Sequence, residues 1–454
     1  MAERIFVPFE GEGSGVEELT WGQQQIWAAM RDQGSSLNNG GVEPVPDGRT
    51  VEDLAADLSF IVSRNQSFRT RLRLNADGRP QQVVARSGEV PMEIVDAGDA
   101  DPADIAGVIF DGYVKTNFDY ANEWPIRQAV VLRGGVPALL VAVVCHLVID
   151  GFGFAALLAD LAARDPVTGL ATGPPAPMQP LEQARWQRTQ AARRQSAAAL
   201  RYWERQLRAI PAPRFAESAD KREPRYWQAY YDSPATDLAA RMVAARTQLD
   251  TSPVLLAAFA VALARVTGNN PVVTQVVVSN RFRPGFAATV SPLTQVGLCV
   301  IDVAGITFDQ AVARAWRSAL GAYKHAYYDP ARLDQLVAMA GRDWREDVLS
   351  CYVNDRRVLH RPEMGDPVPT EQELRAALPR SKLRWGYRRD QPDAKLFFFV
   401  NDVPDTGSYE LCVDTHFMSP ADLEACLLGL EAAVVGAAFD PAAVTGISPV
   451  RATA

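Results

Sequence analysis

The sequence predicts an α/β fold, and three features of its 454 residues support this prediction. Short apolar runs, such as residues 137–144 and 272–278, have the length and composition of strands that are buried on both faces. Longer stretches, such as residues 51–65, repeat apolar side chains at helical spacing. At a usual size of about 150 residues per domain, the chain is long enough for two or three units with substantial cores.

The first elements are expected to be two helices and a β-hairpin. Thr20 is a suitable N-cap with Gln23 at the capping-box position. An Asp-Gly pair supplies the turn of the hairpin. Arg69 and Arg71 alternate along the first hairpin strand and are therefore expected on one face. The expected ranges are a helix at 20–30, a helix at 51–65, and strands at 68–74 and 80–84.

The next elements lead to an apolar strand that ends in a polar cluster, followed by a helix. Residues 164–180 are rich in Pro, Gly and Thr and are typical of a linker. We therefore expect an N-terminal lobe at 1–175 and a C-terminal lobe at 176–454. The elements expected before the linker are a helix at 104–113, strands at 127–132 and 137–144, and a helix at 154–163.

The second half is expected to open with a long arginine-rich helix. Ser252 and Pro253 are typical of a helix start, and Ser419 and Pro420 begin the last helix in the same way. Residues 356–389 are polar, are broken by prolines, and are expected to form a loop with a basic end. The other expected elements are helices at 181–209, 252–266, 308–327 and 330–339, and strands at 272–278, 347–353, 395–400 and 409–415.

Composition excludes several classes of protein. The net charge of −8 argues against a general nucleic-acid binder. No apolar run approaches the ~18 residues that span a bilayer, and the N-terminus lacks a signal-peptide core, so a cytoplasmic protein with no membrane partner is expected. The five cysteines and four histidines show no metal-ligand spacing, so neither disulfides nor a metal is expected.

The apolar strand at 137–144 ends on Cys145 and His146, and Asp150 and Gly151 follow four residues later. A turn between a strand and a helix N-terminus can present an imidazole next to backbone N–H groups and the positive end of the helix dipole. These are the components of a general-base site with oxyanion stabilisation.

Residues 145–151, Cys-His-Leu-Val-Ile-Asp-Gly, resemble the His-His-x-x-x-Asp-Gly signature of nonribosomal peptide synthetase condensation domains, with Cys145 in place of the first His. These domains belong to the chloramphenicol acetyltransferase-like acyltransferase superfamily. Further segments resemble condensation-domain motifs in the same order along the chain. They are residues 19–27, 64–72, 118–119 with 125–127, 276–281 and 295–300.

The resemblance implies two lobes of chloramphenicol acetyltransferase-like topology, arranged in a V with an active-site tunnel between them. It assigns the catalytic role to His146. It makes Asp150 and Arg281 a structural ion pair, and a buried carboxylate does need a cationic partner. The equivalent of Arg69 supports the signature loop in the family, so Arg69 is a structural candidate.

In the proposed chemistry, His146 takes a proton from the acceptor while a thioester is attacked, and the oxyanion forms near the N–H of Gly151. Cys145 beside a histidine suggests thiolate chemistry. Because adjacent residues of a strand point to opposite faces, we instead expect Cys145 to face away from His146 and to support the site structurally.

The resemblance implies a free-standing condensation enzyme of natural-product biosynthesis. The donor would be an acyl or aminoacyl thioester on the phosphopantetheine of a carrier protein, the acceptor an amine or a hydroxyl, and no cofactor would be bound permanently. Two alternatives stay open. One is a coenzyme A-dependent O- or N-acyltransferase, and the other is a catalytically silent platform that recruits partners.

Two basic segments could receive an acidic carrier protein, or in the second case its phosphopantetheine, or could simply be solvated. The first is the arginine-rich helix expected at 181–209. The second is the basic end of the polar loop, with Arg380, Lys382, Arg384, Arg388 and Arg389.

Overall fold

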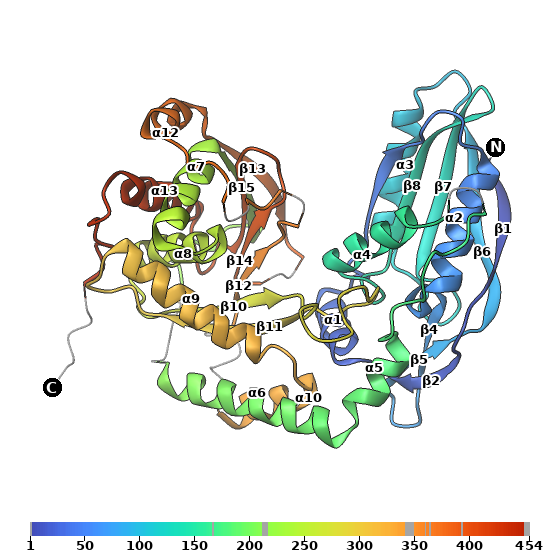
Figure 1. Cartoon of the computed structure of the whole chain (residues 1–454), viewed down its shortest axis with the longest axis horizontal. Coiled ribbons are helices and arrows are strands. Elements are labelled where there is room, and N and C mark those ends of the chain that lie inside the picture. The colour runs from blue at the N-terminus through green and yellow to red at the C-terminus, as the bar shows by residue number, and fades with distance from the viewer. Residues whose placement is uncertain are drawn as a thin grey trace. The chain divides into compact units, whose positions relative to one another are not determined.

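The computed structural model describes residues 2–165, 168–210, 217–340, 349–358, 360–362, 365–391 and 394–448. The chain divides into two compact units, and Figure 1 labels most of their elements. The first unit holds Met1–Arg194 and Ser279–Thr294, and the second holds Gln195–Val278 and Gln295–Ala454. Each unit combines helices with a sheet, which confirms the predicted α/β class. Residues 176–194, expected in the C-terminal lobe, fall in the first unit.

A five-stranded sheet in the order β1-β6-β7-β8-β3 forms the centre of the first unit. β6 and β7 are parallel, and the other neighbours are antiparallel. The hairpin of β7 and β8 confirms the strands expected before the polar cluster. The strands are β1 (Ala2–Glu10), β3 (Asn39–Pro44), β6 (Ser87–Asp96), β7 (Ile126–Arg133) and β8 (Val136–Val144).

Helices cover both faces of this sheet. α2 packs Leu58 and Val62 against strand residues such as Met92 on one face, and α3 packs Ala106 against Val131 on the other. The predicted capping box of Thr20 is present at the start of α1. The helices are α1 (Trp21–Gln33), α2 (Val51–Arg64), α3 (Pro102–Lys115), α4 (Gly151–Ala162) and α5 (Pro180–Gln187).

A second, three-stranded sheet of the first unit has the order β2-β5-β4, with β2 (Gly15–Glu18), β4 (Thr70–Leu74) and β5 (Pro80–Val84). The expected strand start at Phe68 is wrong, because the 3-10 helix η1 (Gln66–Arg69) precedes β4. Arg69 is therefore not on an exposed strand face, and only 1% of its surface is exposed.

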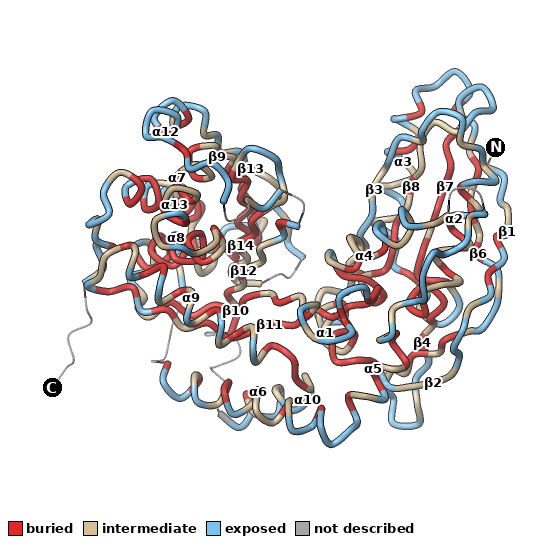
Figure 2. Tube along the Cα trace, viewed as in Figure 1, coloured by how far each residue is buried: buried red, intermediate tan, exposed pale blue. Residues whose placement is uncertain are grey.

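The second unit is built on a seven-stranded sheet in the order β11-β10-β12-β14-β15-β9-β13. Strands β10 and β15 and helix α8 are buried along most of their length (Figure 2). The strands are β9 (Tyr226–Ser233), β10 (Val272–Val278), β11 (Gln295–Ile301), β12 (Cys351–Asp355), β13 (Lys382–Arg389), β14 (Leu396–Asn401) and β15 (Gly407–Asp414).

The largest core of the second unit lies between one sheet face and the helices α7, α8, α9 and α13. α6 and α10 pack on the other face, where Trp203 and Leu207 contact residues of β10 and β11. The helices are α6 (Gln190–Ala209), α7 (Pro234–Thr247), α8 (Thr251–Thr267), α9 (Phe308–Lys324), α10 (Pro330–Ala340), α12 (Glu371–Ala377), the 3-10 helix η2 (Leu378–Arg380) and α13 (Pro420–Phe439).

Three local predictions for this part of the chain were wrong. The single helix expected at 181–209 is two helices, since α5 ends at Gln187 and Thr189 accepts a hydrogen bond from the Ala192 N–H at 3.3 Å near the start of α6. Asp250 rather than Ser252 caps α8. Residues 382–389 form the edge strand β13 instead of a loop, and the first residues of the strand expected at 347–353 lie outside the described ranges.

Among the described helices, none has by itself the length and apolar character needed to cross a membrane. Only α7 and α8 taken together reach that threshold, and the two are bent by 113° relative to each other.

Candidate functional site

The turn after β8 lies in the first unit and begins where the strand pairing ends. Val144 is the last residue of β8 and pairs with Ile126 on one side and Asn39 on the other. Beyond it, the Cys145 N–H donates to the Pro125 carbonyl at 3.1 Å, and the His146 N–H donates to the Ser36 carbonyl at 3.3 Å. The backbone of the candidate base is therefore held by the two segments that lead into the neighbouring strands.

The imidazole of His146 is oriented by the chain that follows it. Its Nδ1 lies 2.7 Å from the carbonyl oxygen of Ile149. A carbonyl only accepts hydrogen bonds, so Nδ1 carries a proton, and in the neutral form of the ring the lone pair is on Nε2. Nε2 has no protein partner among the described residues, and the side chain is half-buried. A general base that acts through Nε2 needs this tautomer, because Nε2 must carry the lone pair.

Helix α4 begins directly after this turn. Asp150 is its N-cap and accepts a hydrogen bond from the Gly153 N–H at 2.8 Å. Gly151 is exposed, and a Cβ added to it would meet nothing within 4 Å. Its N–H has no bonding partner in the described part of the protein. A free N–H at the positive end of a helix, with space beside it, can stabilise a developing negative charge.

Asp150 and Arg281 form the predicted ion pair. The guanidinium approaches the carboxylate at 2.8 Å, and the two side chains are 3% and 10% exposed. The backbone N–H of Leu293 and the hydroxyl of Thr294 also donate to Asp150, at 2.9 and 2.7 Å. Burial alone would raise the pKa of Asp150, but Arg281 and these hydrogen bonds outweigh it and hold the pKa below its ordinary value. The carboxylate is thus ionised and fully bonded.

The carboxylate of Asp150 does not orient the ring of His146, whose bonded partner is Ile149. Arg281 also donates to the carbonyls of Thr289 and Ser291, at 3.0 and 3.1 Å. The ion pair therefore fastens residues 279–294 to the start of α4. The sequence motifs predicted Arg281 but gave no signal for Thr294, because its contact with Asp150 depends on where this segment folds.

Cys145 is buried, with 1% of its surface exposed, and its Sγ lies 3.8 Å from the Ser36 carbonyl oxygen. Burial raises the pKa of the Cys145 thiol to about 12. The thiol is therefore protonated near neutral pH and is a poor nucleophile. All five cysteines are buried free thiols.

Arg69 supports a different segment from the expected one. Its guanidinium donates to the carbonyls of Gly13 and Ala85 at 2.7 and 2.5 Å, and to that of Glu12. These bonds fasten residues 12–13 to the three-stranded sheet. We expected Arg69 to support residues 145–151, but no hydrogen bond joins them among the described residues.

The two basic segments differ in how their charges are engaged. On α6, Arg201, Arg205 and Arg208 are exposed and lie four and three residues apart, which places them on one helix face, and Arg208 pairs with Glu204 at 2.5 Å. On β13, Arg384 pairs with Asp232 at 2.7 Å, and Arg388 stacks over the ring of Trp227 at 3.9 Å. The arginines of β13 are thus engaged within the second unit.

Comparison with known proteins identifies the family. A family model described as Condensation domain matches residues 16–354. Isonitrile lipopeptide synthase of Mycobacterium tuberculosis (strain ATCC 25618 / H37Rv) is 28% identical over 294 residues, which are 61% of this chain and 12% of that protein. Nonribosomal peptide synthetase kk1B of Curvularia clavata is 27% identical over 369 residues, which are 75% of this chain and 3% of that protein. The chain thus spans only a small part of the length of these relatives.

Solved structures share the fold. The condensation domain described for chain release from the enacyloxin polyketide synthase superposes with a TM-score of 0.72 at 19% identity, over 98% of this chain and 85% of that chain. The X-domain in complex with OxyB from teicoplanin biosynthesis gives a TM-score of 0.70 at 16% identity, over 97% of both chains.

The likeness to these structures extends over almost the whole chain and shows the two-lobed, chloramphenicol acetyltransferase-like fold. The family match includes the turn that carries His146 and the residues of the Asp150–Arg281 pair. The chain therefore belongs to the condensation domain family, a family of acyltransferases of natural-product biosynthesis.

Proposed function

We propose that this protein is a condensation enzyme that transfers an acyl or aminoacyl group from a carrier-protein thioester to an amine, with His146 as the base. The observation that carries the proposal is the hydrogen bond between His146 Nδ1 and the Ile149 carbonyl, because it leaves the lone pair on Nε2 of a half-buried imidazole. A hydroxyl acceptor would react in the same way and give an ester.

In the proposed reaction, Nε2 of His146 accepts the proton of the acceptor as its nitrogen or oxygen attacks the thioester carbonyl carbon. The tetrahedral intermediate then collapses, the carbon–sulfur bond breaks, and the imidazolium returns the proton to the leaving thiolate. The same residue serves as base and acid. No covalent intermediate with the enzyme is needed, and the protonated, buried thiol of Cys145 is not suited to forming one.

The oxyanion of the intermediate is proposed to lie against the N–H of Gly151 and the N-terminus of α4. Support comes from the open space next to Gly151 and from the N-cap bond of Asp150, which fixes the first turn of the helix. Removal of one such donor in other enzymes costs on the order of 100- to 1000-fold in kcat. Asp150 and Arg281 are proposed to maintain this geometry without touching the reacting atoms.

The proposed donor is carried on the phosphopantetheine arm of a carrier protein, which acts as a substrate. The likeness to a nonribosomal peptide synthetase supports a donor of this kind. Of the two basic segments, α6 is the better dock for an acidic carrier, since Arg201 and Arg205 are exposed without an acidic partner among the described residues. On β13, Arg384 is already paired.

One alternative has a specific observation in its favour. The likeness to an X-domain that was solved in complex with OxyB fits a platform that recruits a partner protein without turnover. A coenzyme A-dependent acyltransferase is the second alternative, because the same base would serve a coenzyme A thioester.

Intact-mass spectrometry can separate these three functions. The protein is incubated with a panel of acyl-loaded carrier proteins, and with the matching acyl-coenzyme A thioesters, in the presence of amines and alcohols. Release of the acyl group from the carrier into a new amide or ester supports the proposal. Turnover of coenzyme A thioesters alone favours the second alternative, and binding of a carrier without turnover of any donor favours the platform.

A further inference from the structure

Ser36 is the centre of a group of contacts that has no role in the proposed reaction as described above. Residues 34–38 connect α1 to β3, and the Ser36 carbonyl accepts the backbone N–H of His146 at 3.3 Å. Because β8 has ended at Val144, this bond is not part of the sheet ladder. The position of the His146 backbone therefore depends on where residues 34–38 are held.

Each polar group of Ser36 has a partner. Its N–H donates to Oδ1 of Asn117 at 2.8 Å, and its hydroxyl accepts the Phe118 N–H at 2.9 Å. The hydroxyl also lies 2.7 Å from the Tyr120 hydroxyl. Ser36 is completely buried, so these bonds are shielded from competition with water. Residues 117–120 thus hold Ser36 through both its backbone and its side chain.

The backbone of Leu37 shows that the conformation of residues 34–38 is imposed by the surrounding contacts. Its φ is 48°, in the left-handed region that side chains other than glycine rarely adopt. Such a conformation costs about 1 kcal/mol or more and persists only where the surrounding contacts determine it. The contacts that determine it are made by the adjacent, buried Ser36. All polar groups of Ser36 are hydrogen-bonded, and its carbonyl accepts the His146 N–H.

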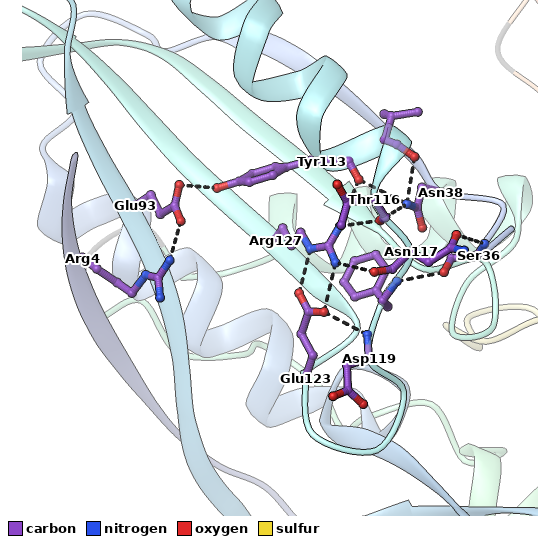
Figure 3. Close-up of polar contacts among 12 residues, drawn as sticks. Arg4, Ser36, Asn38, Glu93, Tyr113, Thr116, Asn117, Asp119, Glu123 and Arg127 are labelled. Atoms are coloured by element: carbon purple, nitrogen blue, oxygen red, sulfur yellow. Dashed lines mark hydrogen bonds and ion pairs between the residues drawn. The ribbon is translucent and has the colours of Figure 1, made fainter. Parts of the chain in front are cut away.

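Asn117 links Ser36 to a charged anchor. Its Nδ2 donates to the Gly34 carbonyl at 3.0 Å, so its amide spans residues 34–36. Its own carbonyl accepts a bond from Arg127 at 3.0 Å. Figure 3 shows Ser36, Asn117, Arg127 and Glu123 as consecutive members of this network.

Arg127 fixes the chain around Asn117. Its guanidinium donates to the carbonyls of Tyr113 and Thr116, at 3.0 and 2.7 Å, and pairs with Glu123 at 2.7 Å. The side chain is 13% exposed, and charge-assisted bonds of this kind are stronger than neutral ones. Arg127 sits on β7, next to the strand that delivers His146. The anchor therefore lies on the strand that pairs with the one ending just before the base.

We infer that Ser36, Asn117 and Arg127 are positioning residues for His146. Arg127 holds Asn117, Asn117 holds Ser36, and the Ser36 carbonyl fixes the backbone from which the imidazole reaches the Ile149 carbonyl. The inference extends the proposed function, since it explains how the proton is kept on Nδ1 and the lone pair on Nε2. A displacement of about 1 Å at a reacting group can cost on the order of 100-fold in rate.

The test reads the state of the imidazole directly. Protein labelled with ¹⁵N-histidine is studied by NMR at about pH 8, above the ordinary imidazole pKa of about 6.5. The chain has four histidines, and the spectrum of His146→Gln assigns the signal of interest. Wild type should show His146 with its proton on Nδ1. Asn117→Ala and Ser36→Ala should each lose this signature, because the Ser36 segment is released.

The matched control is Asn122→Ala, which removes an amide from the same chain segment. Asn122 donates to the exposed Asp119 at 2.9 Å and does not contact Ser36. Its spectrum should equal that of wild type. Unchanged His146 signals in both Asn117→Ala and Ser36→Ala overturn the inference, and so does an equal change in the control. If one of the two variants does not fold, the other decides.

Kinetics add a second readout if the protein turns over a donor. Asn117→Ala and Ser36→Ala should then lower kcat on the order of 10- to 100-fold with little change in KM for the donor. A protein without turnover would contradict the proposed function but would leave the NMR result intact. Failure of the inference and failure of the proposed function are therefore distinguishable.

Discussion

At the scale of single residues, the turn after β8 separates the chemical role from the structural one. The imidazole of His146 is bonded to Ile149, whereas the carboxylate of Asp150 is directed to Arg281, Leu293 and Thr294. A base needs an accessible lone pair, and a buried carboxylate needs complete bonding. Because different residues meet these two needs, substitutions at His146 and Asp150 should have different consequences.

Replacing Cys145 by alanine should leave turnover close to that of wild type, because a protonated, buried thiol takes no part in the proposed transfer. The free energy of unfolding should fall by about 1 kcal/mol, as for removal of a small buried group. Intact mass of the wild-type enzyme during turnover should show no acyl adduct. An adduct on Cys145, or loss of turnover in a stable Cys145→Ala variant, would contradict this.

Replacing Arg281 by alanine should lower the free energy of unfolding of the first unit by about 3–5 kcal/mol, because it leaves the buried Asp150 carboxylate uncompensated. A double-mutant cycle with Asp150→Ala, measured by urea unfolding, checks the pairing. The double variant should lose clearly less than the sum of the single losses. Additive losses would show that the two side chains do not depend on each other.

At the scale of elements, the site depends on the first turn of α4. Gly153 lies in this turn, where an added Cβ would come within 2.8 Å of the Ile149 side chain and 3.1 Å of the Arg281 guanidinium. The absence of a side chain at Gly153 is therefore a condition for the close approach of Arg281 to the helix start.

Gly153→Ala should destabilise the protein, although alanine is ordinarily preferred over glycine inside a helix by about 1 kcal/mol. Gly107→Ala in α3 is the matched control, since its added Cβ meets nothing within 4 Å and the residue is exposed. Thermal unfolding should show a lower midpoint for Gly153→Ala and an equal or higher midpoint for Gly107→Ala. The opposite order would refute the packing role of Gly153.

The elements that the sequence predicted well are those with strong local signals. Thr20 and Ser419 cap helices as expected, and the apolar runs at 137–144 and 272–278 are strands. The wrong predictions have weak or misleading local signals. No Gly or Pro marks the break between α5 and α6, and the charges of β13 are tolerated because it is an edge strand.

At the scale of the whole molecule, the candidate site joins segments that are far apart in the sequence. Family motifs were enough to predict the pairing of Asp150 with Arg281. They could not predict Thr294, Ser36 or Asn117, because these contacts exist only once residues 279–294 and 34–38 have folded onto the first unit. Arg69 was assigned to the site by analogy, and the structure shows it bonded to residues 12–13 instead.

Each unit contains an aspartate paired with arginine, Asp150 buried in the first unit and Asp355 half-buried in the second, and this should make both units sensitive to acid. In the second unit, burial would raise the pKa of Asp355, but Arg357 and Arg361 outweigh it and lower the pKa to about 2. Relative to an unfolded value of about 3.9, the shift corresponds to about 2–3 kcal/mol of stability. This contribution is present above about pH 4 and is lost as the pH falls toward the folded pKa.

Asp355→Asn should therefore be less stable than wild type near neutral pH, and the difference in unfolding free energy should shrink below about pH 4. Urea unfolding at a series of pH values measures this difference in unfolding free energy. Asp99→Asn, at an exposed site in a turn, is the control and should give no such trend. A difference for Asp355→Asn that is constant with pH would contradict the role of its charge.

The central claim is that Nε2 of His146 is the base, and its most direct test is the single-turnover rate of acyl transfer from a loaded carrier protein. Wild type, His146→Ala and His360→Ala are compared, because His360 is exposed and lies in the second unit. His146→Ala should be slower by about 100- to 10,000-fold, the usual contribution of a positioned general base. His360→Ala should match wild type. A His146→Ala rate equal to that of wild type would contradict the claim.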